Sequence, residues 1–483
     1  MSATLIGFVV YLIVVLVAGG ITYTLTKTQE DFLLAGRKLN VWVATFSERA
    51  SGESSWLLLG LPATAATVGL VESWTAIGCV VGIVFAWWAV AEGLRKQTEA
   101  VGALTLPEFF AKRFGRTAVP IRLVATGIIL FFYSFYLAAQ FNGAGTVLDA
   151  TFGIDRFTGI CIGAFVIILY TMLGGFVAVA WTDFLQAIIM IGTLVVLPVV
   201  GAMELTQLPP SERHALGESV LSWTGGATGI AAFTAILSGL SWGFGYCGQP
   251  HTVTRFMSID DPRRIGVGRI IAFLWAAPAF AGALAIGLIG AQIFDLSAMS
   301  DQQVEQLMPI MAKELLPDWL AGVFISGAIA AMMSTADSQL LVGTSAVAED
   351  VCHKGLKMKL SHEGLVRLSR WVTVALGLGG FALAVSSDEL IFQLVSYAWS
   401  GLGSSFGPAI LLTLHWSKTR GEGVLAGMLT GAITTVVWSW LPANDFVHAR
   451  LVSFVASGAM IVALSLALQK RAPAPPGWSG GGQ

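Results

Sequence analysis

The sequence predicts an all-α protein that crosses a membrane many times. Hydrophobic residues make up 55% of the 483 residues and charged residues only 12%, whereas a soluble domain carries about 25% charged residues. The apolar residues are gathered into runs of about 20, the length that a helix needs to cross a bilayer. The basic residues concentrate in alternate connections between these runs. Together these observations predict a polytopic membrane protein with about 13 transmembrane helices.

Each predicted span is one apolar run between short polar connections. The first run has no basic residue before it and no clear cleavage site, so we expect a retained helix rather than a signal peptide. The longest external connection, 203–225, is too short for a separate soluble domain. The predicted spans are 4–25, 42–66, 71–94, 120–147, 157–176, 180–202, 226–253, 266–293, 316–345, 368–386, 390–415, 422–440 and 450–469.

The distribution of Lys and Arg orients these spans. With the N-terminus outside, 22 of the 27 basic residues, Arg255 among them, fall on the cytoplasmic side and 4 fall outside, while Arg49 lies in the second span. Cytoplasmic loops carry this excess in membrane proteins. We therefore expect an external N-terminus and a cytoplasmic C-terminus, with a disordered Pro- and Gly-rich tail at 470–483.

Two predicted spans are interrupted by small and polar residues. The second reads FSERASGESSW over 46–56, and the seventh reads SWGFGYCGQP over 241–250. Gly and Pro weaken helix continuity, and polar groups at this depth need partners within the protein. The two spans lie five apart, as do the broken helices of inverted-repeat transporters, where unwound backbone binds a cation and helix N-termini bind a carboxylate. Close helix packing through glycine is the alternative interpretation.

The ninth span offers oxygen atoms to a cation. The hydroxyls of Ser334 and Thr335 and the carbonyl of Ala331 are hard oxygen ligands of the kind that sodium needs. Such hydroxyls also often bond to their own helix, so this motif alone leaves both interpretations open.

Three carboxylates fall inside or at the edge of spans: Glu53, Asp183 and Asp337. An ionisable group within a membrane span is a functional hypothesis by default. Glu53 is expected to contact sodium or a solute ammonium group. The alternatives are a structural bridge to Arg49, one helical turn away, and neutralisation of Glu53 by a proton.

These motifs resemble those of the sodium/solute symporter family, and within it the bacterial sodium/proline symporters. The similarity extends from Leu-Ala-Gly-Arg, ending at Arg37, to the last spans. Its most specific parts are SWLLLGLP ending at Pro62, WTD ending at Asp183, WGFGYCGQPH ending at His251 and MSTADSQLL ending at Leu341.

The resemblance implies a LeuT-type inverted repeat of five plus five helices, with one helix before it and two after it. The chain then divides into an N-terminal helix with the first cytoplasmic loop (1–41), a first repeat (42–202), an external loop (203–225), a second repeat (226–417), two C-terminal helices (418–469) and the tail (470–483).

The resemblance also implies the binding residues. Sodium would be held by Ala50, Glu53, Ala331, Ser334 and Thr335, with Ala50, Glu53 and Ala331 contributing carbonyls. A second sodium, as in some relatives, would fall on Asp183, Ser334, Asp337 and Ser338. The solute pocket would be lined by Ser54, Ser55, Trp56, Tyr136, Trp242, Tyr246, Gln249 and Pro250.

The implied function is sodium-coupled uptake of L-proline, or a similar amino-acid-like solute, across a bacterial inner membrane by alternating access. The partners would be sodium, the solute and membrane lipid, with no nucleic acid and no obligatory protein partner. This chain departs from the proline symporters where they carry Asp-Met-Ser-Gly-Trp, because it has Gly-Glu-Ser-Ser-Trp over 52–56. The carboxylate is moved by one residue.

Other functions are weighed against this one. A symporter for another small organic solute and a sensor with a transporter fold stay as alternatives. A channel fits interrupted helices less well than an occluded site does. We do not expect an enzyme, because the sequence has no metal-ligand cluster, nucleophile–base pair or nucleotide-binding loop.

Overall fold

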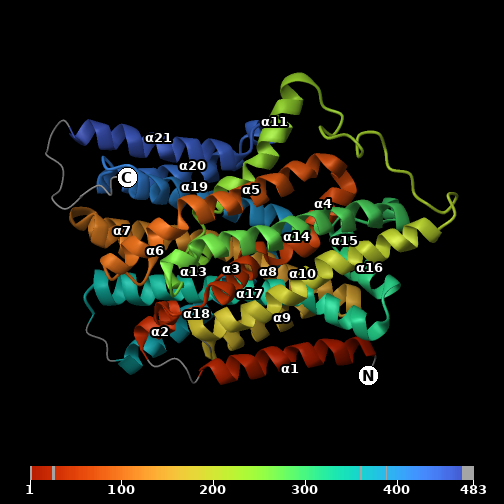
Figure 1. Ribbon diagram of the computed structural model, residues 1–483, viewed down its shortest axis with the longest axis horizontal. Coiled ribbons are helices and arrows are strands. Elements are labelled where there is room, and N and C mark those ends of the chain that lie inside the picture. The colour runs from red at the N-terminus through yellow and green to blue at the C-terminus, as the bar shows by residue number, and fades with distance from the viewer. Residues whose placement is uncertain (1–2, 24–27, 174, 359–361, 388, 470–483) are drawn as a thin grey trace.

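The computed structural model describes residues 3–23, 28–173, 175–358, 362–387 and 389–469. These residues form a bundle whose long helices run roughly parallel to one axis (Figure 1). Within the described residues, β structure is limited to one isolated bridge between Leu39 and Ile259. The prediction of an all-α protein is therefore confirmed. The predicted disorder of the tail falls outside the described residues.

A helix lies over each range that the sequence predicts as a span. These helices are α1 (Ala3–Tyr23), α3 and α4 (Val41–Ser55, Leu61–Val68), α5 and α6 (Ser73–Ala89, Ala91–Ala100), α8 (Ala118–Phe152), α9 (Arg156–Leu173), α10 (Phe176–Gln207), α11 to α13 (Gly229–Leu240, Trp242–Gly245, Pro250–Ser258), α14 (Ile265–Ile293), α17 (Asp318–Ser345), α18 (His362–Ser386), α19 (Ile391–His415), α20 (Gly421–Ser439) and α21 (Ala449–Gln469). Among the described residues, eight helices, or nine if a bent pair counts as one, are long and apolar enough to cross a membrane.

Short helices lie at the ends of the bundle. They include α2 (Gln29–Leu34), α7 (Leu106–Arg113), α15 (Asp301–Val304) and α16 (Leu307–Leu315). The start of α1 lies at the same end as α15, and the end of α21 lies toward the opposite end, where α7 also lies (Figure 1).

The core of the bundle is built around α17. In the most apolar stretch of the helical segment from Asp318 to Gly355, 83% of residues are buried, against 22% for α21. Both α3 and α8 pack against α17, and α21 lies at the periphery of the bundle (Figure 1). A helix that is covered on all sides can carry polar residues at membrane depth, because other protein groups supply their partners.

Both predicted helix breaks are present. In α3, Ser54 has φ +37° and ψ −169°, values that a residue other than glycine rarely adopts. A wide π-helical turn follows over Trp56–Gly60. In the seventh span, helices α11–α12 and α13 meet at a bend of 45°, and residues 246–249 between them are not helical.

One residue was placed wrongly from sequence. Arg255, counted above with the cytoplasmic connections, lies inside α13 with 1% of its surface exposed. Its neighbours Phe256 to Ser258 are also buried. Counting charges along the sequence cannot distinguish a basic residue in a loop from one that folds back into the bundle.

Candidate functional site

The predicted sodium residues lie together where the break in α3 meets α17. The Ser334 hydroxyl donates to the carbonyl oxygens of Ala50 and Ala331, at 3.0 Å in each case. The Thr335 hydroxyl donates to the carbonyl of Ser51 at 2.9 Å. All five residues are buried. Hydroxyl groups of α17 thus meet backbone carbonyls of α3, and oxygen donors of this kind are the ones that sodium takes.

The Glu53 side chain lies apart from these oxygens and forms an ion pair. Its Oε1 accepts from Arg49 Nη1 at 2.6 Å, and its two oxygens accept from the Tyr246 hydroxyl at 3.2 and 3.1 Å. Its backbone carbonyl accepts from the Trp56 N–H. Of the alternatives that the sequence left open for this carboxylate, the structure contains the bridge to Arg49.

Arg49 pairs with a second carboxylate that sequence reasoning missed. Its Nε and Nη2 both donate to the carboxylate of Glu48, which also accepts from Trp87 Nε1 at 3.1 Å. The three charged residues are almost fully buried. The adjacent letters Glu-Arg within a span were the available signal for this pair.

Two of the residues expected to hold a second sodium, Asp183 and Ser338, bond to Arg255. Its Nη2 donates to Asp183 Oδ2 at 2.9 Å, to the Ser51 hydroxyl at 2.9 Å and to the Ser338 hydroxyl. Its Nε donates to the Ser47 hydroxyl at 3.1 Å. The guanidinium group thus donates hydrogen bonds to two oxygens that the sequence assigned to an ion, one of Asp183 and one of Ser338.

Two carboxylate oxygens near Arg255 accept no hydrogen bond from the described residues. Asp183 Oδ1 and Asp337 Oδ2 are buried and have no hydrogen-bond partner among the described residues. Asp337 Oδ1 accepts from the Ser338 hydroxyl at 3.3 Å. Since a buried polar atom normally has a partner, these two oxygens are where another donor or a cation would bind.

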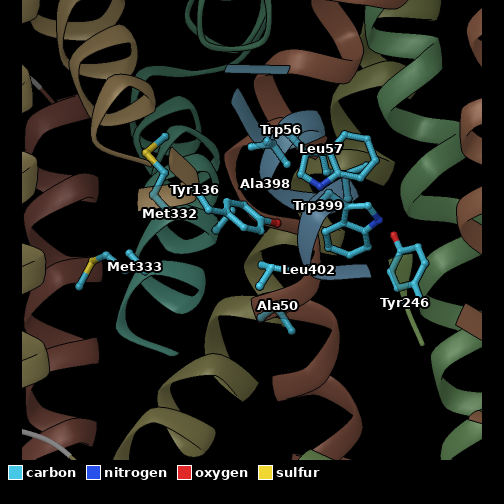
Figure 2. Close-up of a cluster of buried hydrophobic side chains, with 14 of the residues drawn as sticks. Ala50, Trp56, Leu57, Tyr136, Tyr246, Met332, Met333, Ala398, Trp399 and Leu402 are labelled. Atoms are coloured by element: carbon cyan, nitrogen blue, oxygen red, sulfur yellow. The ribbon is translucent and has the colours of Figure 1, made fainter. Parts of the chain in front are cut away.

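The predicted solute residues form an aromatic cluster at the two helix breaks. The indole rings of Trp56 and Trp242 stack with centroids 4.6 Å apart. Tyr246 packs edge-on against Trp399 at 4.8 Å, and Tyr136 lies 6.5 Å from the same ring. Figure 2 shows Tyr136 and Tyr246 approaching Trp399 from opposite sides. These rings are buried and come from α3, α8, the α11–α13 segment and α19.

The remaining predicted pocket residues lie around this cluster. Ser54 accepts a long hydrogen bond of 3.5 Å from the Tyr136 hydroxyl, and the Ser55 N–H donates to Gln140 Oε1 at 3.1 Å. Gln249 Nε2 donates to the Trp399 carbonyl at 3.1 Å. Pro250 begins α13. Sequence reasoning did not find Gln140 or Trp399, because both lie within spans that show no interruption.

The chain is similar to known proteins over nearly its whole length. A model of the sodium:solute symporter family matches residues 32–431. The chain is 36% identical to the sodium/proline symporter of Escherichia coli (strain K12), covering 97% of this chain and 95% of that protein. It is 34% identical to the osmoregulated proline transporter OpuE of Bacillus subtilis (strain 168), with the same two coverages.

Solved structures with the same fold are more distant in sequence. A Na+-coupled sialic acid symporter in a substrate-bound outward-open state superposes with a TM-score of 0.77 at 18% identity, covering 98% of this chain and 99% of that chain. The nucleobase-cation-symport-1 family transporter Mhp1, in a closed conformation, gives a TM-score of 0.56 at 13% identity, with coverages of 93% and 97%.

Proposed function

Since the chain belongs to the sodium:solute symporter family, we propose that it is a secondary active transporter of the bacterial inner membrane that couples sodium entry to the uptake of L-proline or a closely similar solute. The proline symporters and transporters among its relatives, aligned over nearly the whole chain, support proline as the solute.

The observation that carries this proposal is the meeting of hydroxyl and carbonyl oxygens at the break of α3. Ala50, Ala331, Ser334 and Thr335 would hold the coupling sodium, with the Glu53 carbonyl as a further ligand. The Ser334 hydroxyl now donates to the carbonyls of Ala50 and Ala331, and on sodium binding this hydroxyl would rotate its proton away and offer its oxygen to the ion. Binding would join α3 to α17.

The solute would lie against the aromatic cluster at the two breaks. Trp56, Trp242 and Tyr246 offer flat apolar walls and a hydroxyl, and Ser54, Ser55, Tyr136, Gln249 and Pro250 would complete the pocket. Because the sodium ligands and Trp56 belong to the same broken helix, occupation of one site would favour the other through the conformation of residues 50–56.

A second sodium position is proposed only at the oxygens that Arg255 leaves free. Asp183 Oδ1 and Asp337 Oδ2 would be its carboxylate contacts, with Ser338 beside them. Arg255 pairs with Asp183, and an ionised Asp337 would leave one negative charge for a cation to balance.

The architecture proposed for this function has thirteen spans, an external N-terminus and a cytoplasmic C-terminus. Residues 42–202 and 226–417 would be the two inverted repeats, linked by the external loop 203–225. Residues 1–41 would precede them, and the two helices of 418–469 would follow. The matched breaks in α3 and in α11–α13 support this division.

Competition for uptake tests the proposed solute. Unlabelled L-proline should displace labelled proline from the reconstituted protein better than glucose or acetate does, because neither combines a carboxylate with a cationic nitrogen. Effective competition by glucose and none by amino acids would assign the chain to a different solute.

A further inference from the structure

Three charged side chains of α3 lie together without contact with solvent. Glu48 has 2% of its surface exposed, and Arg49 and Glu53 have none exposed. Both ion pairs of this cluster involve Arg49, and no other basic residue in the described part of the chain pairs with either glutamate. Two carboxylates against one guanidinium leave one negative charge, and an uncompensated charge at this depth is costly.

The hydrogen bonds of the cluster are divided unequally. Both oxygens of Glu48 accept from Arg49, and Oε2 also accepts from Trp87. Glu53 Oε1 accepts from Arg49, whereas Oε2 has the Tyr246 hydroxyl as its one hydrogen-bond donor among the described residues. That hydroxyl lies at 3.2 and 3.1 Å from the two oxygens, and its single proton cannot serve both fully. Glu53 Oε2 is therefore the acceptor with spare capacity.

This oxygen lies beside the aromatic cluster of the solute pocket. Tyr246, which donates to Glu53 Oε2, packs against Trp399. Trp399 Nε1 in turn donates to the Trp242 carbonyl at 3.1 Å. The neighbourhood also contains donors in need of an acceptor. Trp56 Nε1 and Trp242 Nε1 are buried and have no hydrogen-bond partner within the described residues, and an indole N–H can only donate.

Glu53 Oε2 and the two unpaired indole N–H groups thus bring an electron-rich acceptor and two donors to one aromatic cluster. A zwitterion is complementary to this arrangement, because its cationic nitrogen needs an acceptor and its carboxylate needs donors. A solute with the carboxylate alone would leave the negative charge at Glu53 unbalanced.

We propose that Glu53 determines specificity by binding the positively charged nitrogen of the solute, and that Arg49 and Glu48 are positioning residues that hold its carboxylate toward the pocket. The substrate class is a small zwitterion with a cationic amine next to a carboxylate. This proposal rests on the proposed function for the location of the pocket, but it does not depend on proline being the solute.

The test uses pairs of solutes that differ only in the charged nitrogen. Purified full-length protein in lipid nanodiscs, at saturating sodium, is titrated with L-proline and with tetrahydrofuran-2-carboxylate, which has a ring oxygen instead. L-Pipecolate and tetrahydropyran-2-carboxylate form a second pair. The wild type should prefer the nitrogen member of a pair by roughly tenfold to a hundredfold, the range expected for a hydrogen bond to a charged group.

Glu53→Gln should remove this preference. Binding of the nitrogen member should weaken by about tenfold to a hundredfold, while binding of the oxygen member and the sodium requirement stay unchanged. Glu48→Gln, which lets Arg49 neutralise Glu53, should reduce the preference less. Glu108→Gln is the matched control, because it changes a buried glutamate on α7 that pairs with Lys112 and Lys354 and should keep the wild-type preference.

Each outcome decides between interpretations. An undiminished preference in Glu53→Gln, or a changed sodium requirement with the preference intact, would overturn the proposal. So would a wild type that binds neither nitrogen member or that shows no preference in either pair. If pipecolate but not proline depends on Glu53, proline is the wrong solute and the specificity proposal stands. If Glu53→Gln does not fold, Glu53→Asp, which withdraws the charge by one methylene group, should show a reduced preference.

Discussion

Arginine side chains balance buried carboxylates at two places in the bundle. Arg49 lies between Glu48 and Glu53 on one helix, and Arg255 joins Asp183 to serines on α3 and α17. A buried ion pair is weak evidence for stability, because desolvation opposes the attraction, but removing one partner is strongly destabilising. These arginines therefore fix where the carboxylates that they contact point.

At the residue scale, the first prediction concerns the two hydroxyls of the sodium site. Ser334→Ala and Thr335→Ala should each raise the sodium concentration for half-maximal uptake by roughly tenfold to a hundredfold, because each removes an oxygen ligand worth about 1.5–3 kcal/mol. Ser326→Ala is the control. Ser326 is buried on the same helix, and among the described residues its hydroxyl donates to the Gly322 carbonyl of that helix. Unchanged sodium dependence in both variants would place the ion elsewhere.

At the scale of elements, the break before α13 is positioned by close helix contacts. A Cβ at Gly245 would come 1.7 Å from Trp399 Nε1, and a Cβ at Gly82 would come 2.3 Å from the Gly243 backbone. Glycine therefore allows the unwound seventh span to approach both α5 and α19. Gly here serves close packing as well as helix interruption, so the two interpretations left open by the sequence both hold.

The N-terminus of α19 is capped from another element. Its own N-cap residue Leu390 makes no side-chain cap, and the buried carboxylate of Glu305, between α15 and α16, accepts from the Ile391 N–H at 2.8 Å. The next residue, Phe392, packs on Trp242 at 5.2 Å. A carboxylate at a helix N-terminus is stabilising, so this contact ties the loop to the end of the aromatic cluster.

The second prediction concerns the titration of this cap. Burial raises the pKa of Glu305 to about 7, although the backbone N–H groups of Ile391 and Phe392 oppose the shift. With a raised carboxyl pKa, Glu305 keeps its proton to a higher pH in the folded state than in the unfolded state. The contribution of Glu305 to the free energy of unfolding therefore falls as pH rises from about 4.5 through about 7.

Melting temperatures of the wild type and Glu305→Gln, measured from about pH 5 to about pH 9, check this sign. The Gln variant should gain stability relative to the wild type as pH rises through about 7. A difference between the two proteins that does not change with pH would show that Glu305 does not titrate in this range.

The sequence predicted both helix breaks because Ser, Gly and Pro are concentrated there and leave a local pattern. It did not predict the partners of the polar residues. Glu48 and Arg255 acquire their roles from contacts with other helices. Arg255 comes soon after Pro250 and before Arg263 and Arg264, so in the sequence it looks like part of a basic loop. Trp399 and Gln140 belong to continuous helices, where no local irregularity distinguishes a pocket residue from a packing residue.

At the scale of the whole molecule, the start of α1 and the end of α21 lie at opposite ends of the bundle (Figure 1). The connection between α10 and α11 extends from the end where α1 starts, whereas α2 and α7 lie toward the other end (Figure 1). The proposed orientation puts the first of these ends outside the cell.

The third prediction tests that orientation. In a background without the four native cysteines, a cysteine at Ser211 should react with a membrane-impermeant maleimide added to intact cells, and one at Lys357 should not. Both positions are exposed, so burial does not protect either one. Labelling of Lys357→Cys alone would reverse the topology.

The central claim is that a sodium gradient drives solute uptake by this chain. The most direct measurement is accumulation of labelled L-proline in proteoliposomes containing the purified protein, with sodium high outside and then with equal sodium on both sides. We predict accumulation above the external concentration only with the inward gradient, and loss of that accumulation in the Ser334→Ala, Thr335→Ala double variant. Proline uptake of equal extent with and without the gradient, or no proline uptake under either condition, would contradict the account.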